Sequence, residues 1–128
     1  MTVALNHTIV AARDAEESAA FLSEIMGLPA PERLYHFVMV ETANGVSLDF
    51  ATVADGDNVV TQHYAFLVSE DEFDAIFGRI LERGLDHWAD PGRHQPGRIN
   101  HNDGGRGVYF PDPSGHLLEI ITRPYGSG

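Results

Sequence analysis

Two histidines and two carboxylates lie at matching places in the two halves of the sequence. His7 and His63 each stand in an early apolar run of their half, and Asp49 and Glu119 each lie inside a later apolar run. Two neutral imidazoles with one or two carboxylates form a ligand set that suits Zn, Fe(II), Mn, Ni or Co. Three protein ligands of this kind leave positions open for substrate and water, which is typical of a catalytic site. If these side chains converge, the sequence predicts a divalent metal centre that carries out chemistry.

Glu119 is the most informative of the four residues. In an extended strand alternate side chains point to opposite faces, so Glu119 shares its face with Leu117 and Ile121. A strand this apolar is not expected to lie freely in water. Because an isolated buried carboxylate costs several kcal/mol, we expect Glu119 to have a bound cation or another polar partner.

Each of these residues taken alone also has a simpler explanation. A histidine in a strand is more often a hydrogen-bonded core residue than a metal ligand. Glu119 is about equally well explained by an ion pair with an arginine, and Asp49 by solvation or a local hydrogen bond. The repeat favours a shared site, because independent core residues have no reason to recur at matched positions in both halves.

The elements that must position these residues repeat as well. Each half reads as a strand, a helix and then further strands, with helices predicted over Asp14 to Met26 and Ser69 to Arg83. Both helices begin with capping-box residues and end before a glycine. The Asn44-Gly45 pair between two apolar runs predicts a hairpin. Strands are expected over residues 3–11, 36–42, 46–51, 60–68, 107–110 and 116–122. We therefore expect module one over about 1–53, a linker over about 54–59 and module two over about 60–124.

Composition excludes several classes of protein. The 128 residues fit one ordinary domain, and the formal charge of −11 opposes binding to nucleic acid. The absence of cysteine excludes disulfides and thiolate ligands, so a metal would have to rest on histidine and carboxylate. No apolar run approaches the roughly 20 residues needed to span a bilayer, and no secretion signal is recognised at the start. We expect a cytoplasmic protein that binds neither nucleic acid nor membranes.

Three motifs in this sequence resemble one known family. They are Asn6-His7-Thr8, Gln62-His63-Tyr64, and the Phe-x-Asp-Pro-x-Gly turn that leads into Leu118-Glu119-Ile120. Together they resemble the vicinal oxygen chelate superfamily, which includes glyoxalase I, extradiol dioxygenases, fosfomycin-resistance enzymes and bleomycin-binding proteins. The resemblance covers nearly the whole chain and implies an α+β fold, in which two βαβββ modules form a curled mixed sheet around a metal cleft.

The resemblance also implies roles for individual residues. His7, His63 and Glu119 match the family's metal ligands, so one divalent ion is expected, with Fe, Zn, Ni or Mn left open. In glyoxalase-like members the position of Asp49 supplies a further acidic ligand. Because aspartate is one methylene shorter than glutamate, we assign Asp49 a role as general base or outer-shell group, with direct ligation as the lesser alternative.

A polar loop over residues 90–107 precedes the last two strands. It carries His101, a candidate proton carrier, and Arg106, a candidate substrate contact. Two adjacent glycines, Gly104 and Gly105, would let this segment act as a lid. Two aromatic residues are further candidates for lining the substrate pocket: Tyr64 and Tyr109.

Two functions are compatible with the sequence. The leading hypothesis is a metal-dependent enzyme that acts on a small oxygenated or aromatic molecule, by dioxygenase or by glyoxalase/lyase-type chemistry. The alternative is a non-catalytic small-molecule binder of the bleomycin-resistance type, but the family's binders lack the ligand triad that this chain retains. The resemblance further implies a homodimer, and whether modules are shared across its interface stays open. Substrate, metal and pathway stay open.

Overall fold

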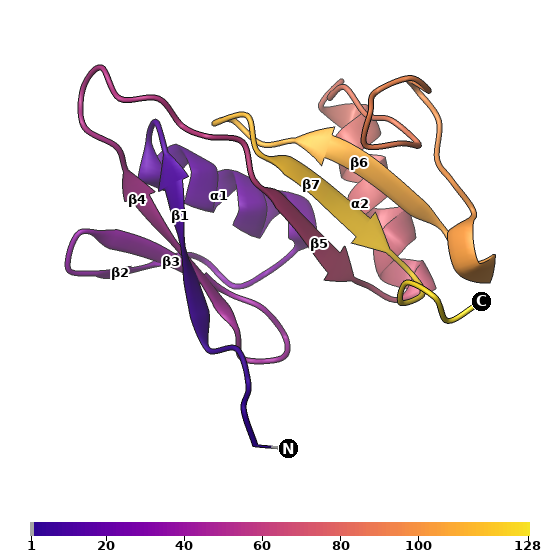
Figure 1. The fold of residues 1–128 in the computed structure, drawn as a ribbon, viewed down its shortest axis with the longest axis horizontal. Helices are drawn as coiled ribbons and strands as arrows, with labels where there is room; N and C mark the ends of the chain where they lie inside the picture. Colours follow the sequence, from indigo (N-terminus) through magenta and orange to yellow (C-terminus); the bar gives the residue numbers. More distant parts are fainter. Residues whose placement is uncertain (1) are drawn as a thin grey trace. The chain divides into compact units, whose positions relative to one another are not determined.

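Each half of the chain forms its own mixed β-sheet with one helix (Figure 1). The computed structural model describes residues 2–128, and the chain divides into two compact units at Val60 and Thr61. The first unit contains β1 (His7–Ala12), α1 (Ala15–Met26), β2 (Glu32–Leu34), β3 (Phe37–Glu41) and β4 (Ser47–Thr52). The second contains β5 (His63–Leu67), α2 (Glu70–Glu82), the short 3₁₀ helix η1 (Asn102–Gly104), β6 (Gly107–Pro111) and β7 (Leu117–Ile121). The expected α+β class is confirmed.

The two sheets have related topologies. In the first unit the strand order is β1-β4-β3-β2, with β1 parallel to β4 and the other pairs antiparallel. In the second unit the order is β5-β7-β6, with β5 parallel to β7 and β6 antiparallel to β7. The strand that a βαβββ unit would place directly after α2 is reduced to single backbone pairs of Trp88 with Tyr109 and with Pro96. The Gly- and Pro-rich sequence that follows Trp88 does not continue the pairing.

One face of each sheet is apolar and buried. In the first unit the aligned residues Val10, Phe50 and Val38 are buried, and in the second Ile120 and Val108 are fully buried on the corresponding face. Alternation along each strand sends the neighbouring residues to the opposite face. On the first sheet this opposite face carries His7 and Asp49, and on the second sheet it carries His63 and Glu119.

The helix limits follow from local hydrogen bonds. The Asp14 side chain accepts from the amides of Glu16 and Glu17 at 3.0 and 3.3 Å, and Ser69 and Glu72 form a complete capping box. Gly27 ends α1 in the left-handed conformation that favours glycine. The longer helix has 13 residues, and within residues 2–128 no helix is long and apolar enough to cross a bilayer.

Some sequence predictions of strands need correction. The Asn44-Gly45 hairpin is confirmed by the antiparallel pairing of β3 with β4. β1 and β5 begin later than predicted, at His7 and His63, because their partner strands β4 and β7 begin at the residues opposite, Ser47 and Leu117. β2 was not predicted, and its residues are exposed on both faces, so it carries no apolar alternation that could reveal it.

Candidate functional site

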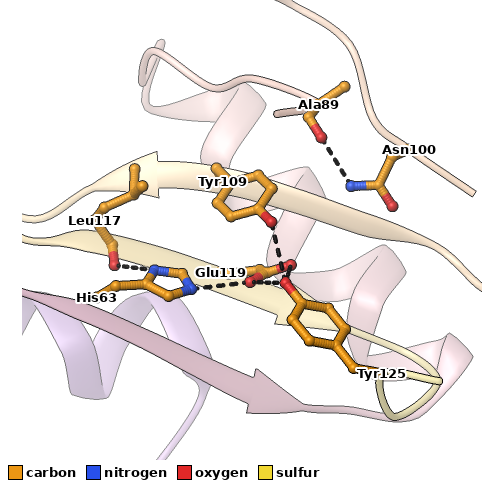
Figure 2. A network of polar contacts seen from close by, with 7 residues as sticks. All are labelled: His63, Ala89, Asn100, Tyr109, Leu117, Glu119 and Tyr125. Carbon is orange, nitrogen blue, oxygen red and sulfur yellow. Dashed lines mark hydrogen bonds and ion pairs between the residues drawn. The ribbon is translucent and has the colours of Figure 1, made fainter. Parts of the chain in front are cut away.

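His63 and Glu119 meet on the face of the second sheet that lies opposite its apolar face, called the open face below (Figure 2). In the β5–β7 register His63 lies opposite Leu117 and Ala65 lies opposite Glu119, so the two polar side chains are diagonal neighbours. The distance from His63 Nε2 to Glu119 Oε1 is 3.1 Å. The His63 side chain is 44% exposed and that of Glu119 is 1% exposed, so the pair combines a buried carboxylate with an accessible imidazole.

The orientation of His63 is fixed by the backbone of β7. His63 Nδ1 lies 3.0 Å from the carbonyl oxygen of Leu117, and because that oxygen can only accept, Nδ1 carries the proton. In the neutral imidazole Nε2 then presents its lone pair towards a carboxylate oxygen of Glu119. Two acceptors at this distance require a proton or a cation between them. A histidine whose outer N–H is held by a backbone carbonyl is typical of metal sites.

Glu119 has two further neighbours on the same face, Tyr125 and Tyr109. The Tyr125 hydroxyl lies 2.7 and 2.8 Å from the two Glu119 oxygens, and 3.1 Å from the Tyr109 hydroxyl. Burial raises the pKa of both phenols above the ordinary value, and the nearby carboxylate of Glu119 adds to the rise. Both tyrosines are therefore neutral hydrogen-bond donors. This extends the sequence prediction for Tyr109, which lies directly opposite Glu119 in the β6–β7 register.

The corresponding face of the first unit carries His7 and Asp49. His7 lies opposite Ser47 in the β1–β4 register, and its Nδ1 is 2.7 Å from Oδ1 of the adjacent Asn6. Asp49 is 8% exposed and accepts a hydrogen bond from the Ser47 hydroxyl. Its carboxylate is thus already engaged within its own strand. Within the described residues of either unit, no group of three His, Asp or Glu side chains is gathered that could hold an ion.

A hollow of about 310 Å³ opens on this part of the first unit. Its lining includes Asn6, Ser47, Glu41 and Met39. Met39 and Glu41 lie opposite Asp49 and Ser47 in the β3–β4 register, so the hollow lies on the face that carries His7 and Asp49. The first unit therefore contributes a partly polar recess next to its candidate residues.

The structure places Arg106 on the other side of the second sheet. Its guanidinium donates to Glu70 Oε1 and Asp74 Oδ1, each at 2.8 Å, and lies 4.3 Å from the centre of the Phe73 ring. All three partners belong to α2. The predicted substrate contact gains no support from this placement, because Arg106 fastens the polar loop to the helix.

Tyr64 likewise faces away from Glu119. It is half-buried, and its ring packs edge-on against His116 with centroids 5.9 Å apart. Burial, and secondarily Asp112, raises the pKa of Tyr64. The alternation of β5 puts Tyr64 on the core side whenever His63 is on the open side. Its predicted place in a substrate pocket is not supported by this arrangement.

The loop over residues 90–107 is held by specific bonds. The Asp90 carboxylate accepts from the amides of His94 and Gln95, and the Asn100 side chain donates to Ala89 O. A Cβ on Gly105 would lie 2.5 Å from Thr122 Oγ1, so this glycine permits a close contact with β7's continuation. These contacts anchor the loop in the structure, and its predicted movement as a lid stays a prediction.

Two further residues are His101, which was predicted from the sequence, and Tyr125, which was not. His101 is exposed and directly precedes η1, and its predicted role in proton transfer stays a prediction. Tyr125 was not predicted at all, although it touches Glu119. The only signal for it was an aromatic residue between Pro124 and Gly126, beyond the last predicted strand.

Comparison with known proteins agrees with this fold. The family model of the Glyoxalase/Bleomycin resistance protein/Dioxygenase superfamily matches residues 4–120. The chain is 29% identical over 126 residues to the metallothiol transferase FosB of Shouchella clausii (strain KSM-K16), covering 95% of this chain and 82% of that protein. It is 30% identical over 125 residues to the glutathione transferase FosA of Serratia marcescens, covering 94% and 81%.

A solved structure named Oxidase ChaP-H2 superposes with a TM-score of 0.95 at 62% sequence identity, covering 100% of this chain and 99% of that one. Likeness of this extent spans both units and all of their strands. The chain belongs to the Glyoxalase/Bleomycin resistance protein/Dioxygenase superfamily.

Proposed function

We propose that this protein is a metal-dependent oxidase that acts on a small oxygenated or aromatic molecule, with one divalent ion held by His7, His63 and Glu119. The observation that carries the proposal is the pair formed by His63 Nε2 and Glu119 Oε1, 3.1 Å apart on the open face of β5 and β7. The imidazole is oriented by a backbone carbonyl and the carboxylate is buried, which is the donor chemistry that a divalent ion needs.

The third ligand in this proposal is His7, the residue of the first unit that occupies the place of His63. We further propose that both units form one functional domain over residues 1–128 and that the protein works as a homodimer. A dimer would let either copy's first unit supply His7. The internal repeat of strand histidines supports this assignment.

The choice of an oxidase rests on the extent of similarity. The structure named an oxidase is 62% identical over essentially the whole chain, whereas the two transferases are 29% and 30% identical. Since loops choose the reaction within a shared fold, the relative that retains most of the loops is the better guide. Glyoxalase or transferase chemistry is the second candidate.

The residues around the proposed ion have separable tasks. When bound, the ion supplies positive charge that stabilises oxygen atoms of the substrate, and iron would add one-electron chemistry. Leu117 O holds the His63 ring so that its free lone pair faces the site. The neutral Tyr109 hydroxyl can donate a hydrogen bond to a substrate oxygen, and Asp49, which accepts a hydrogen bond from Ser47, would act as general base.

The test begins with the metal content of protein purified without added ions and then reloaded separately with Fe(II), Mn(II), Zn(II) and Ni(II). We expect one ion per chain in the wild type, a large loss in His63→Ala and His7→Ala, and no loss in the matched control His94→Ala, whose ring is exposed in the polar loop. Oxygen uptake with a panel of catechols and polyphenols by the Fe(II) form would support the oxidase. Turnover of a thiohemiacetal by the Ni(II) or Zn(II) form, without oxygen uptake, would favour glyoxalase chemistry. A metal-free protein whose binding of small aromatic ligands survives His63→Ala would favour the sequestering binder.

A further inference from the structure

The C-terminal tail folds back so that the Tyr125 hydroxyl lies at the open mouth of the Glu119 carboxylate (Figure 2). Its oxygen is 2.7 Å from Oε1 and 2.8 Å from Oε2, so it sits almost symmetrically between them. This is the position that a cation chelated by both oxygens would take. The hydroxyl and such an ion exclude one another, because the two cannot share that space.

The same hydroxyl also lies in the direction of the imidazole. His63 Nε2 points at Glu119 Oε1, which is one of the two oxygens that Tyr125 contacts. An ion bound by both His63 and Glu119 would have to approach the carboxylate oxygen that now accepts a hydrogen bond from the Tyr125 hydroxyl. Tyr125 therefore competes for the carboxylate that the proposed metal centre needs.

The tail is fastened by few contacts, and those of Gly126 and Arg123 are exposed. The Gly126 amide donates to Asp103 Oδ1 at 3.2 Å, Arg123 donates to Ser127 O at 2.9 Å, and the Tyr125 hydroxyl meets that of Tyr109 at 3.1 Å. Tyr125 is 62% exposed, so little apolar area holds its ring in place. Segments secured by exposed hydrogen bonds and little burial open at low free-energy cost. Tyr125 and the rest of the tail can therefore move away from Glu119 without unfolding of the second sheet.

We propose that Tyr125 is a removable cap on Glu119, carried by the C-terminal tail over residues 123–128, and that metal loading requires this tail to open. The inference rests on the proposed metal centre and adds to it a control on access. In the closed state the Glu119 carboxylate accepts a hydrogen bond from the Tyr125 hydroxyl, which gives the buried group a polar partner before an ion arrives. The apparent affinity for the ion is reduced by the fraction of molecules in which the tail is open.

The first test measures Mn(II) binding to the full-length protein by the EPR signal of free Mn(II), for wild type and Tyr125→Phe. Phenylalanine keeps the ring and removes the competing hydroxyl, so we expect the Kd for Mn(II) to fall about tenfold, as suits loss of one hydrogen bond to a charged group. Tyr35→Phe is the matched control, since Tyr35 lies in the first unit and is 86% exposed, and its Kd should equal that of the wild type. An unchanged or higher Kd in Tyr125→Phe would overturn the cap, and a higher Kd would identify Tyr125 as a support for Glu119.

A second measurement follows the tail itself by amide hydrogen exchange of the segment 123–128, with and without Mn(II). Opening of the tail should speed exchange at Gly126 and Ser127 when Mn(II) binds to the wild type. Slower exchange, or none of the expected change, contradicts the cap even if the metal binds. A wild type that binds no Mn(II) at all overturns both the cap and the metal centre, whereas normal Mn(II) binding with an unaltered tail overturns the cap alone.

Discussion

The two units place a histidine and a carboxylate at the same register positions, yet the carboxylates have different partners. In the first unit the residue opposite His7 is Ser47, whose hydroxyl donates to Asp49. In the second unit the residue opposite His63 is Leu117, whose side chain offers no donor. Glu119 is also one methylene longer than Asp49. As a result Glu119 reaches His63 while Asp49 is satisfied inside its own strand.

The duplicated fold repeats the strand register in both units but does not repeat the hydrogen-bond partners of the carboxylates. The register, and with it the face on which each side chain lies, is set by backbone pairing and recurs in both units. The partner of each carboxylate depends on the side chain next to it in the strand and on its own length. The neighbouring residue, Ser47 or Leu117, and the length of the carboxylate side chain together account for the different partners of Asp49 and Glu119.

The largest effect is expected from exchanging the two carboxylates for amides. Glu119→Gln should weaken binding of Mn(II) or Fe(II) by about 100-fold or more, because it changes the proposed direct ligand, whereas Asp49→Asn should weaken it by about tenfold or less. Isothermal titration with each ion checks both values. Equal losses in the two variants would make Asp49 a fourth ligand and remove the contrast between the units.

A smaller effect is expected at the helix starts, where both units use side-chain caps. Ser69→Ala and Asp14→Ala should each lower the free energy of unfolding by about 1 kcal/mol, since each leaves helix amides without a partner. Urea titration followed by circular dichroism measures the change. Ser69→Thr keeps the capping oxygen and should recover most of the loss at α2, and a Thr variant as unstable as the Ala variant would argue against capping.

The smallest effect concerns Glu70, which fastens the polar loop in the second unit only. A hydrogen bond from the Thr122 hydroxyl, followed by that from Arg106, lowers the pKa of Glu70. A carboxylate whose pKa is lower in the folded state stabilises the fold above its unfolded pKa, and this contribution is lost as the pH falls through the folded value. Glu70→Gln should therefore reduce the Tm at pH 7, with the gap closing below about pH 4.

Circular dichroism melts at pH 7, 5 and 3 test this dependence. Glu82→Gln, which removes a charge from the other end of α2 without touching Arg106, is the matched control. A Tm difference for Glu70→Gln that stays constant down to pH 3 would show that the pairing with Arg106 and Thr122 does not stabilise the charged form.

Much of the fold could be predicted from local rules. The caps at Asp14 and Ser69, the Asn44-Gly45 hairpin and the alternation around Glu119 each depend on residues close together in the chain. The same alternation could have placed Arg106 and Tyr64 correctly. Tyr64 lies two residues from Phe66 in β5, and Arg106, which directly precedes β6, lies two residues from Val108, so both share a side with core-facing residues.

The sequence by itself determined the repeat, the helix limits and the faces of the strands, because backbone pairing and side-chain alternation follow from local pattern. Tertiary structure alone decided that His63 and Glu119 come within 3.1 Å and that Tyr125 folds back to reach Glu119. The physical reason is distance along the chain: 56 residues separate His63 from Glu119, and only strand register and the fold-back of the tail bring such groups into contact.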